Sequence, residues 1–129
     1  YSSLIAMSAS GNVVAYISGR LHVMVNDGGW KEKWSVDIDE GGAQNYDNIQ
    51  ISPDETKIYV SEGWYQFKVF AIDGRLLTHQ VIGGGGGFFD NESVIFNQDT
   101  TTKPKLSKYF INSKQQSIFQ INCNIKNCK

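Results

Sequence analysis

Three acidic side chains gather in the segment VDIDEGG (residues 36–42), where Asp37, Asp39 and Glu40 precede two glycines. Carboxylate oxygens at nearby positions of a loop are ligands that Ca²⁺ accepts. The segment lacks the downstream carboxylate of an EF-hand, so a solvated loop after a strand explains the same residues. We therefore expect no cofactor, with calcium held by Asp37, Asp39 and Glu40 as the alternative.

The two histidines, His22 and His79, are the side chains best suited to general acid–base catalysis near neutral pH. Each lies in an expected strand with no cysteine or second histidine close to it in the sequence. The chain shows no serine in a nucleophile elbow, and its carboxylates are dispersed over turns. We therefore predict no catalytic residue and expect that the protein is not an enzyme.

Aromatic side chains offer a different chemistry, which is contact with a protein or a sugar. Trp64 and Tyr65 occur in EGWYQF, at the expected tip of a hairpin. Exposed aromatic rings supply a large contact area at a low cost in side-chain entropy. Trp30 and Tyr46 are further binding candidates, and packing between neighbouring sheets is the competing explanation for all four residues.

Two features concern covalent modification. Cys123 and Cys128 are separated by four residues near the end of the chain, and they are either a small disulfide loop or two free thiols. Without a second pair of ligands they do not form a zinc site. Asn91 begins the glycosylation acceptor sequence NES in an expected turn. Together these features favour a secreted, extracellular setting.

Composition limits the class of protein. The chain has 129 residues, a hydrophobic share of 40%, 13 glycines and only two prolines, which suits one globular domain over residues 1–129 with many tight turns. Its formal net charge of −1 gives no electrostatic footprint for nucleic acid. No apolar run has the length of a membrane span.

The positions of these residues depend on a repeated unit. SASGNVVAY (8–16), SPDETKIYV (52–60) and FFDNESVIF (88–96) each contain a polar turn followed by an alternating strand. Residues two apart in a strand share one face. The equivalent apolar positions are Val14, Ile58 and Val94, followed by Tyr16, Val60 and Phe96.

A second repeated unit follows each of these strands. LHVMVNDGG, FKVFAIDGR and the weaker copy LSKYFINSK are apolar runs that end in Asp or Asn. Asp-Gly is a strong hairpin signal, and a further strand follows each copy in KWSVDI, LLTHQVI and SIFQIN. Helix signals are nearly absent. We predict an all-β protein of three four-stranded units, at about 4–44, 45–83 and 87–123, with the pentaglycine 83–87 before the third.

These repeats resemble the blades of β-propeller proteins. ISPDETKIYVSEGWYQFKVFAIDGRLL is similar to blades of the YVTN and WD-repeat-like kind, and IAMSASGNVVAYISGRLHVMVNDGGWKEKWSVD is similar to PQQ-like blades. The third unit departs from the pattern, because it lacks the proline and has Asn112-Ser113 in place of Asp-Gly. The resemblance implies an architecture and no particular activity. The constellation that would hold the PQQ cofactor is absent.

Three blades are too few for a closed ring, since propellers close with about four to eight. We therefore expect an incomplete propeller that other chain segments or subunits complete, for example a homo-oligomer in which two sets of three make six. A β-sandwich is the alternative fold.

The function expected from these observations is a non-enzymatic structural or interaction module, a scaffold with a protein partner. One alternative is an extracellular domain that binds carbohydrate or protein through its aromatic tips. Another is part of a propeller enzyme whose active site is assembled from several blades.

Overall fold

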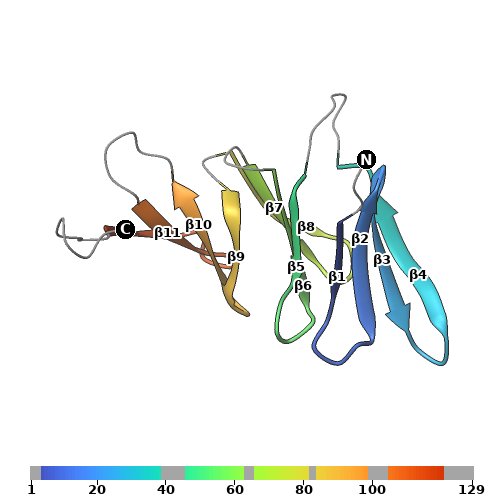
Figure 1. Cartoon of the computed structure of the whole chain (residues 1–129). Coiled ribbons are helices and arrows are strands. Elements are labelled where there is room, and N and C mark those ends of the chain that lie inside the picture. Colours follow the sequence, from blue (N-terminus) through green and yellow to red (C-terminus); the bar gives the residue numbers. More distant parts are fainter. Residues whose placement is uncertain (1–3, 39–45, 63–65, 82–83, 99–104, 121–129) are drawn as a thin grey trace, which may run out of the picture.

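The computed structural model describes residues 4–38, 46–62, 66–81, 84–98 and 105–120. Within these ranges twelve strands form three antiparallel sheets of four strands each, and no helix occurs (Figure 1). None of the described segments is therefore a helix that could cross a membrane. The predicted all-β class with three four-stranded units is confirmed.

Each sheet is a meander in which consecutive strands pair. Sheet 1 contains β1 (Leu4–Met7), β2 (Val13–Ser18), β3 (Arg20–Asn26) and β4 (Trp30–Val36). Sheet 2 contains β5 (Asn48–Ile51), β6 (Lys57–Glu62), β7 (Gln66–Ala71) and β8 (Leu76–Gln80). Sheet 3 contains β9 (Gly84–Asp90), β10 (Ser93–Gln98), β11 (Lys105–Phe110) and β12 (Gln116–Gln120). The third sheet thus begins inside the glycine run, before the expected start of the third unit at residue 87.

The turn between the first and second strands has the same chemistry in sheets 1 and 2. The Ser8 hydroxyl accepts a hydrogen bond from the Val13 amide, and the Ser52 hydroxyl accepts one from the Lys57 amide, each at 3.0 Å. These contacts close both turns in the same way. The serine that recurs in sheets 1 and 2 therefore helps to specify where β1 and β5 end.

The turn between the third and fourth strands explains the Asp-Gly motif. Gly28 has a φ of 68° and Gly74 a φ of 99°, a left-handed region that glycine enters without steric cost. In sheet 3 this conformation falls on Lys114, with a φ of 59°. The hairpin therefore forms in the weaker third copy as well, although a side chain there strains the backbone.

Two apolar cores lie between the sheets, and sheet 2 lies between the other two (Figure 1). The core between sheets 1 and 2 contains Val13, Ala15, Leu21, Val23, Ile38, Tyr46, Ile49, Ile58, Val60 and Phe70. The core between sheets 2 and 3 contains Tyr59, Phe67, Val69, Val94, Phe96, Tyr109 and Ile111. Three sheets therefore stack in a row, in contrast to the two layers of the alternative sandwich.

Neighbouring sheets contact each other through their first strands, since β1 contacts β5 and β5 contacts β9. We call β1, β5 and β9 the inner strands. Such an arrangement is that of propeller blades, whose first strands lie nearest the axis of the ring. The chain forms an open, propeller-like partial ring.

Candidate functional site

The inner strand β5 divides its side chains between two different environments. Ile49 and Ile51 pack into the core that faces sheet 1. Asn48 and Gln50 alternate with them and therefore point the other way, toward β9. The Asn48 amide donates a hydrogen bond to the Gly86 carbonyl, and the Gln50 carbonyl oxygen accepts one from the Phe88 amide at 3.0 Å. Two amide side chains thus bind the backbone of the next inner strand.

The glycine run allows this close approach. A Cβ atom at residue 87 would lie 2.1 Å from the Gln50 oxygen, and one at residue 86 would lie 1.7 Å from the Ile95 carbonyl oxygen. At residue 86 the obstacle is backbone, so only glycine fits there. At residue 87 the obstacle is the end of the Gln50 side chain, so a side chain there would displace Gln50 from its contact with β9. The backbone of β9 therefore passes close to neighbouring atoms at Gly86 and Gly87.

Two buried hydroxyls lie beside these amides. The strand register pairs Ser61 with Asn48 and Tyr59 with Gln50, so all four side chains share one face of sheet 2. Tyr59 and Ser61 are fully buried, and neither hydroxyl makes a hydrogen bond. A buried hydroxyl without a partner costs about 1–3 kcal/mol, and in native proteins such a group calls for a specific explanation.

The electrostatic surroundings keep the Tyr59 phenol protonated. Burial raises the pKa of Tyr59, the neighbouring Ser61 hydroxyl and Gly86 backbone oppose the rise, and the negative charge of Asp47 adds to it. Asp47 precedes β5, is exposed, and donates its backbone amide to the Ser61 carbonyl at 3.0 Å. We call Asp47, Asn48, Gln50, Tyr59 and Ser61 the inner-strand polar cluster. It combines an exposed carboxylate with two amides, a hydroxyl and a protonated phenol, which can both donate and accept hydrogen bonds.

The histidines lie outside this cluster, and each has its own partner. The distance between His22 Nδ1 and Glu32 Oε1 is 2.5 Å, and the His22 ring stacks on Tyr16 with 4.7 Å between ring centroids. His79 Nε2 lies 2.6 Å from the Gln66 side-chain oxygen. His22 belongs to β3 and His79 to β8, in different sheets, and no contact joins them within the described ranges.

The aromatic binding candidates lie apart from one another. Trp30 begins β4 and is 48% exposed, as a surface aromatic would be. Tyr46 is buried in the first core, and its hydroxyl donates to the Ile38 carbonyl at 3.2 Å. Trp64 and Tyr65 lie outside the described residues. Tyr46 therefore packs between sheets 1 and 2, which was the competing explanation for these aromatics.

Only some of the candidate metal ligands and modification sites lie within the described residues. Asp37 is exposed after β4, whereas Asp39 and Glu40 lie outside the described residues, as do Cys123 and Cys128. Within the described ranges no group of three His, Cys, Asp or Glu side chains could hold a metal ion. Calcium at this segment and the disulfide stay predictions.

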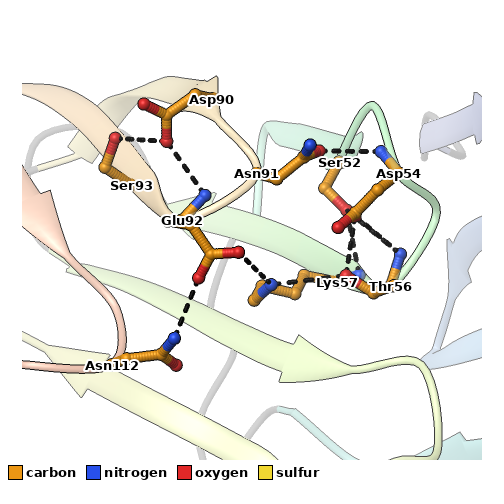
Figure 2. Close-up of polar contacts among 9 residues, drawn as sticks. All are labelled: Ser52, Asp54, Thr56, Lys57, Asp90, Asn91, Glu92, Ser93 and Asn112. Carbon is orange, nitrogen blue, oxygen red and sulfur yellow. Dashed lines mark hydrogen bonds and ion pairs between the residues drawn. The ribbon is translucent and has the colours of Figure 1, made fainter.

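Asn91 lies in the turn between β9 and β10, where it joins two sheets. Its side-chain oxygen accepts a hydrogen bond from the Asp54 amide at 2.7 Å (Figure 2). This contact leaves the question of glycosylation open, because a glycan would attach to the side-chain nitrogen.

The turns of sheets 2 and 3 make further polar contacts. Lys57 Nζ lies 3.8 Å from a Glu92 oxygen, and Asn112 donates to the other Glu92 oxygen at 2.8 Å (Figure 2). Burial is the largest single influence on the pKa of Asp54 and raises it. Hydrogen bonds from Thr56 and Ser52, with the charge of Lys57, together outweigh burial and hold this pKa below its ordinary value.

A related contact joins sheets 1 and 2, where the Ser10 hydroxyl donates to a Glu55 oxygen at 2.7 Å. Sequence reasoning missed these turn-to-turn contacts. The available signal was the polar turn that recurs in each repeat.

The fold places the chain in the class of propeller-like all-β proteins, as an open set of three blades. No protein-family model matches the chain, and no curated protein matches it in sequence.

Solved structures do resemble it. One is a candidate 6-phosphogluconolactonase from Bacteroides uniformis ATCC 8492, with 18% identity and a TM-score of 0.62 over 88% of this chain and 38% of that one. Another candidate 6-phosphogluconolactonase, from Bacteroides fragilis NCTC 9343, has 16% identity and a TM-score of 0.62 over 94% of this chain and 39% of that one. At such identities the likeness shows the fold, and this chain spans about two fifths of each protein's length.

These neighbours correct one sequence-based prediction. A non-enzymatic structural or interaction module was expected, but both solved proteins are named as candidate enzymes. The alternative that agrees better with them is part of a propeller enzyme with a composite active site. The sequence-based prediction rested on the absence of catalytic groups close together along the chain, and an active site assembled from several blades would show no such pattern.

Proposed function

We propose that this chain is part of a propeller enzyme that hydrolyses the cyclic ester of a sugar acid. The observation that carries the proposal is the likeness to two proteins named as candidate 6-phosphogluconolactonases. The substrate in that name is a lactone, a ring closed by an ester bond, with a phosphate group attached.

Lactone hydrolysis makes three demands on the protein. A base takes a proton from the attacking water, hydrogen-bond donors stabilise the oxyanion on the former carbonyl, and a proton reaches the ring oxygen as the C–O bond breaks. Within the inner-strand polar cluster, Asp47 is the exposed carboxylate and therefore the candidate base. The amides of Asn48 and Gln50 hold β9 beside it.

The phosphate group requires positive charge, which the inner strands described here do not provide. The sequences of β1, β5 and β9 contain no lysine or arginine. Cations that bind the phosphate would therefore come from other blades around the axis. This need for outside residues is the physical reason for proposing a composite site.

The test measures hydrolysis of 6-phosphogluconolactone by the assembled protein, followed as acid release and corrected for spontaneous hydrolysis. Loss of a general base lowers the rate by about 10²–10⁴-fold, so Asp47→Asn is expected to fall in that range. The matched control is Asp27→Asn, an exposed aspartate in the β3–β4 turn, where Asn-Gly preserves the turn signal. A folded, assembled protein that does not accelerate the reaction contradicts the proposal, as does full activity of Asp47→Asn.

A further inference from the structure

The side-chain amide of Gln50 is fixed in one orientation by the neighbouring inner strand. Its oxygen accepts a hydrogen bond from the Phe88 amide at 3.0 Å. Since a backbone N–H only donates, the oxygen is the branch of the amide that faces Phe88, and the nitrogen, Nε2, is the other branch. Sheet 2 packs against a sheet on each side, so both faces of β5 have their neighbours in the described structure.

The nitrogen of this amide is a hydrogen-bond donor that solvent reaches. Gln50 Nε2 has no hydrogen-bond partner among the described residues. In the same ranges, the fully buried side-chain nitrogen and oxygen atoms without a partner are the hydroxyls of Tyr59 and Ser61. Gln50 itself is half-buried. Its nitrogen is therefore an oriented donor that is open to a ligand.

The glycine run gives the amide its place. The Gln50 amide lies against Gly87, where a Cβ atom would collide with its oxygen and its nitrogen alike. The strand β9 thus provides both the hydrogen bond that orients the amide and the clearance in which it lies. A donor that is fixed before the ligand arrives needs no reorganisation during a reaction.

Lactone hydrolysis requires such a donor. When water adds to the carbonyl carbon, the π electron pair of the C=O bond moves onto the oxygen, and the base takes the proton of the water. The inner strands contain no lysine or arginine, and their side-chain N–H donors belong to Asn48 and Gln50. Asn48 already donates its amide nitrogen to the Gly86 carbonyl. Gln50 is therefore the inner-strand side chain whose amide nitrogen is available to the oxyanion.

The spacing between Gln50 and the candidate base suits this role. Asp47 precedes Gln50 by three residues, which span at most about 11 Å of extended chain. Between base and donor lie the attacking water, the carbonyl carbon and its oxygen. Hydrogen bonds of about 2.8–3.0 Å at both ends and an attack distance of about 3 Å extend this row to about 10 Å.

We propose that Gln50 is a catalytic residue whose Nε2 donates a hydrogen bond to the oxyanion formed on the lactone carbonyl. The inference rests on the proposed function and adds to it the group that stabilises the transition state. As the intermediate collapses, the electron pair returns to form the C=O bond of the acid, the ring C–O bond breaks, and the ring oxygen leaves with a proton.

The first test compares two variants in the hydrolysis of 6-phosphogluconolactone by the assembled protein. Gln50→Glu retains an oxygen for the Phe88 amide and removes the donor, and Gln50→Met removes the donor without adding charge. Each is expected to lower kcat by about 10²–10³-fold, as loss of one oxyanion donor does, with KM little changed. The control Gln115→Glu adds the same charge at an exposed position between β11 and β12 and keeps full kcat. Circular dichroism verifies folding of each variant.

A purely structural role of Gln50 predicts a different result, because Gln50→Glu preserves the contact with Phe88 and would then remain active. Full kcat in either Gln50 variant of an active protein overturns the inference and leaves the proposed function standing. A folded, assembled wild type that does not accelerate the reaction contradicts the proposed function and this inference together.

The second test does not depend on turnover. The side-chain NH₂ signals of Gln50 in the ¹⁵N-labelled assembled protein are assigned by their absence from Gln50→Glu. They are expected to shift when the product 6-phosphogluconate is added, because its new carboxylate accepts a hydrogen bond where the oxyanion stood. Unchanged signals at a saturating concentration of 6-phosphogluconate overturn the inference.

Discussion

Removing one buried hydroxyl, by Tyr59→Phe, is expected to stabilise the protein. The Tyr59 side chain is fully buried and its hydroxyl makes no hydrogen bond. Its ring contacts, with centroids 5.5 Å from that of Phe67 and 6.1 Å from that of Phe88, are available to phenylalanine as well. Burying the Tyr59 hydroxyl without a hydrogen bond costs about 1–3 kcal/mol, and the substitution removes this cost while losing little packing. We expect the free energy of unfolding to rise by about 1 kcal/mol.

The control is the same substitution at a tyrosine whose hydroxyl has partners. The Tyr109 hydroxyl lies 3.1 Å from the Thr78 hydroxyl and accepts a hydrogen bond from the Gln80 amide, also at 3.1 Å. Tyr109→Phe deletes both hydrogen bonds. The hydroxyl of Thr78, which is buried, then loses one of its hydrogen-bond partners. The substitution is expected to lower the free energy of unfolding by about 1 kcal/mol.

Urea unfolding followed by tryptophan fluorescence measures both variants, with the midpoint compared at unchanged slope. The reasoning depends on the two substitutions having opposite signs. If Tyr59→Phe destabilises as much as Tyr109→Phe, the Tyr59 hydroxyl has a partner, such as a buried water, and the account of the inner-strand polar cluster is wrong.

Two further predictions concern the glycine run and the polar turns. Gly86→Ala and Gly87→Ala are each expected to destabilise the protein by about 1–3 kcal/mol or more. Adding Gln50→Ala should restore stability to the Gly87→Ala variant only, because the obstacle at Gly86 is the Ile95 carbonyl. Equal rescue of both variants in thermal unfolding would contradict this geometry. Because hydrogen bonds hold the pKa of Asp54 below its ordinary value, its contribution is present above the unfolded-state pKa of about 4 and is lost as the pH falls through the lowered value. Asp54→Asn should therefore reduce the acid sensitivity of stability between pH 5 and pH 2, and an unchanged stability profile in urea titrations would refute this.

Much of each blade could be predicted from local patterns. Alternation identifies which side chains share a strand face, and the serine and Asp-Gly turns set strand ends through contacts within a few residues. Local patterns do not identify what covers a face. Val14 and Ile58 look alike in the sequence, yet only Ile58 is buried against another sheet.

The candidate site was harder to predict because its contacts join distant parts of the chain. Gln50 reaches the Phe88 amide across 38 positions, and no motif marks that pair. The one available signal was a strand with two amides between isoleucines, together with a glycine run one repeat later. Tyr46 was placed among surface aromatics because its partner, the Ile38 carbonyl, lies on another segment.

The turn-to-turn contacts have a direction along the chain. Glu55 of sheet 2 holds the turn of sheet 1, and Asn91 of sheet 3 holds the turn of sheet 2, so each blade secures the one before it. Stability in such an array spreads as nearest-neighbour coupling. The turns of sheets 1 and 2 are therefore stabilised only when the following sheet is in place. The corresponding turn of sheet 3 would need the same contact from the next blade around the ring. A blade added after sheet 3 would therefore secure the turn of sheet 3 directly and would leave the contacts of sheets 1 and 2 unchanged.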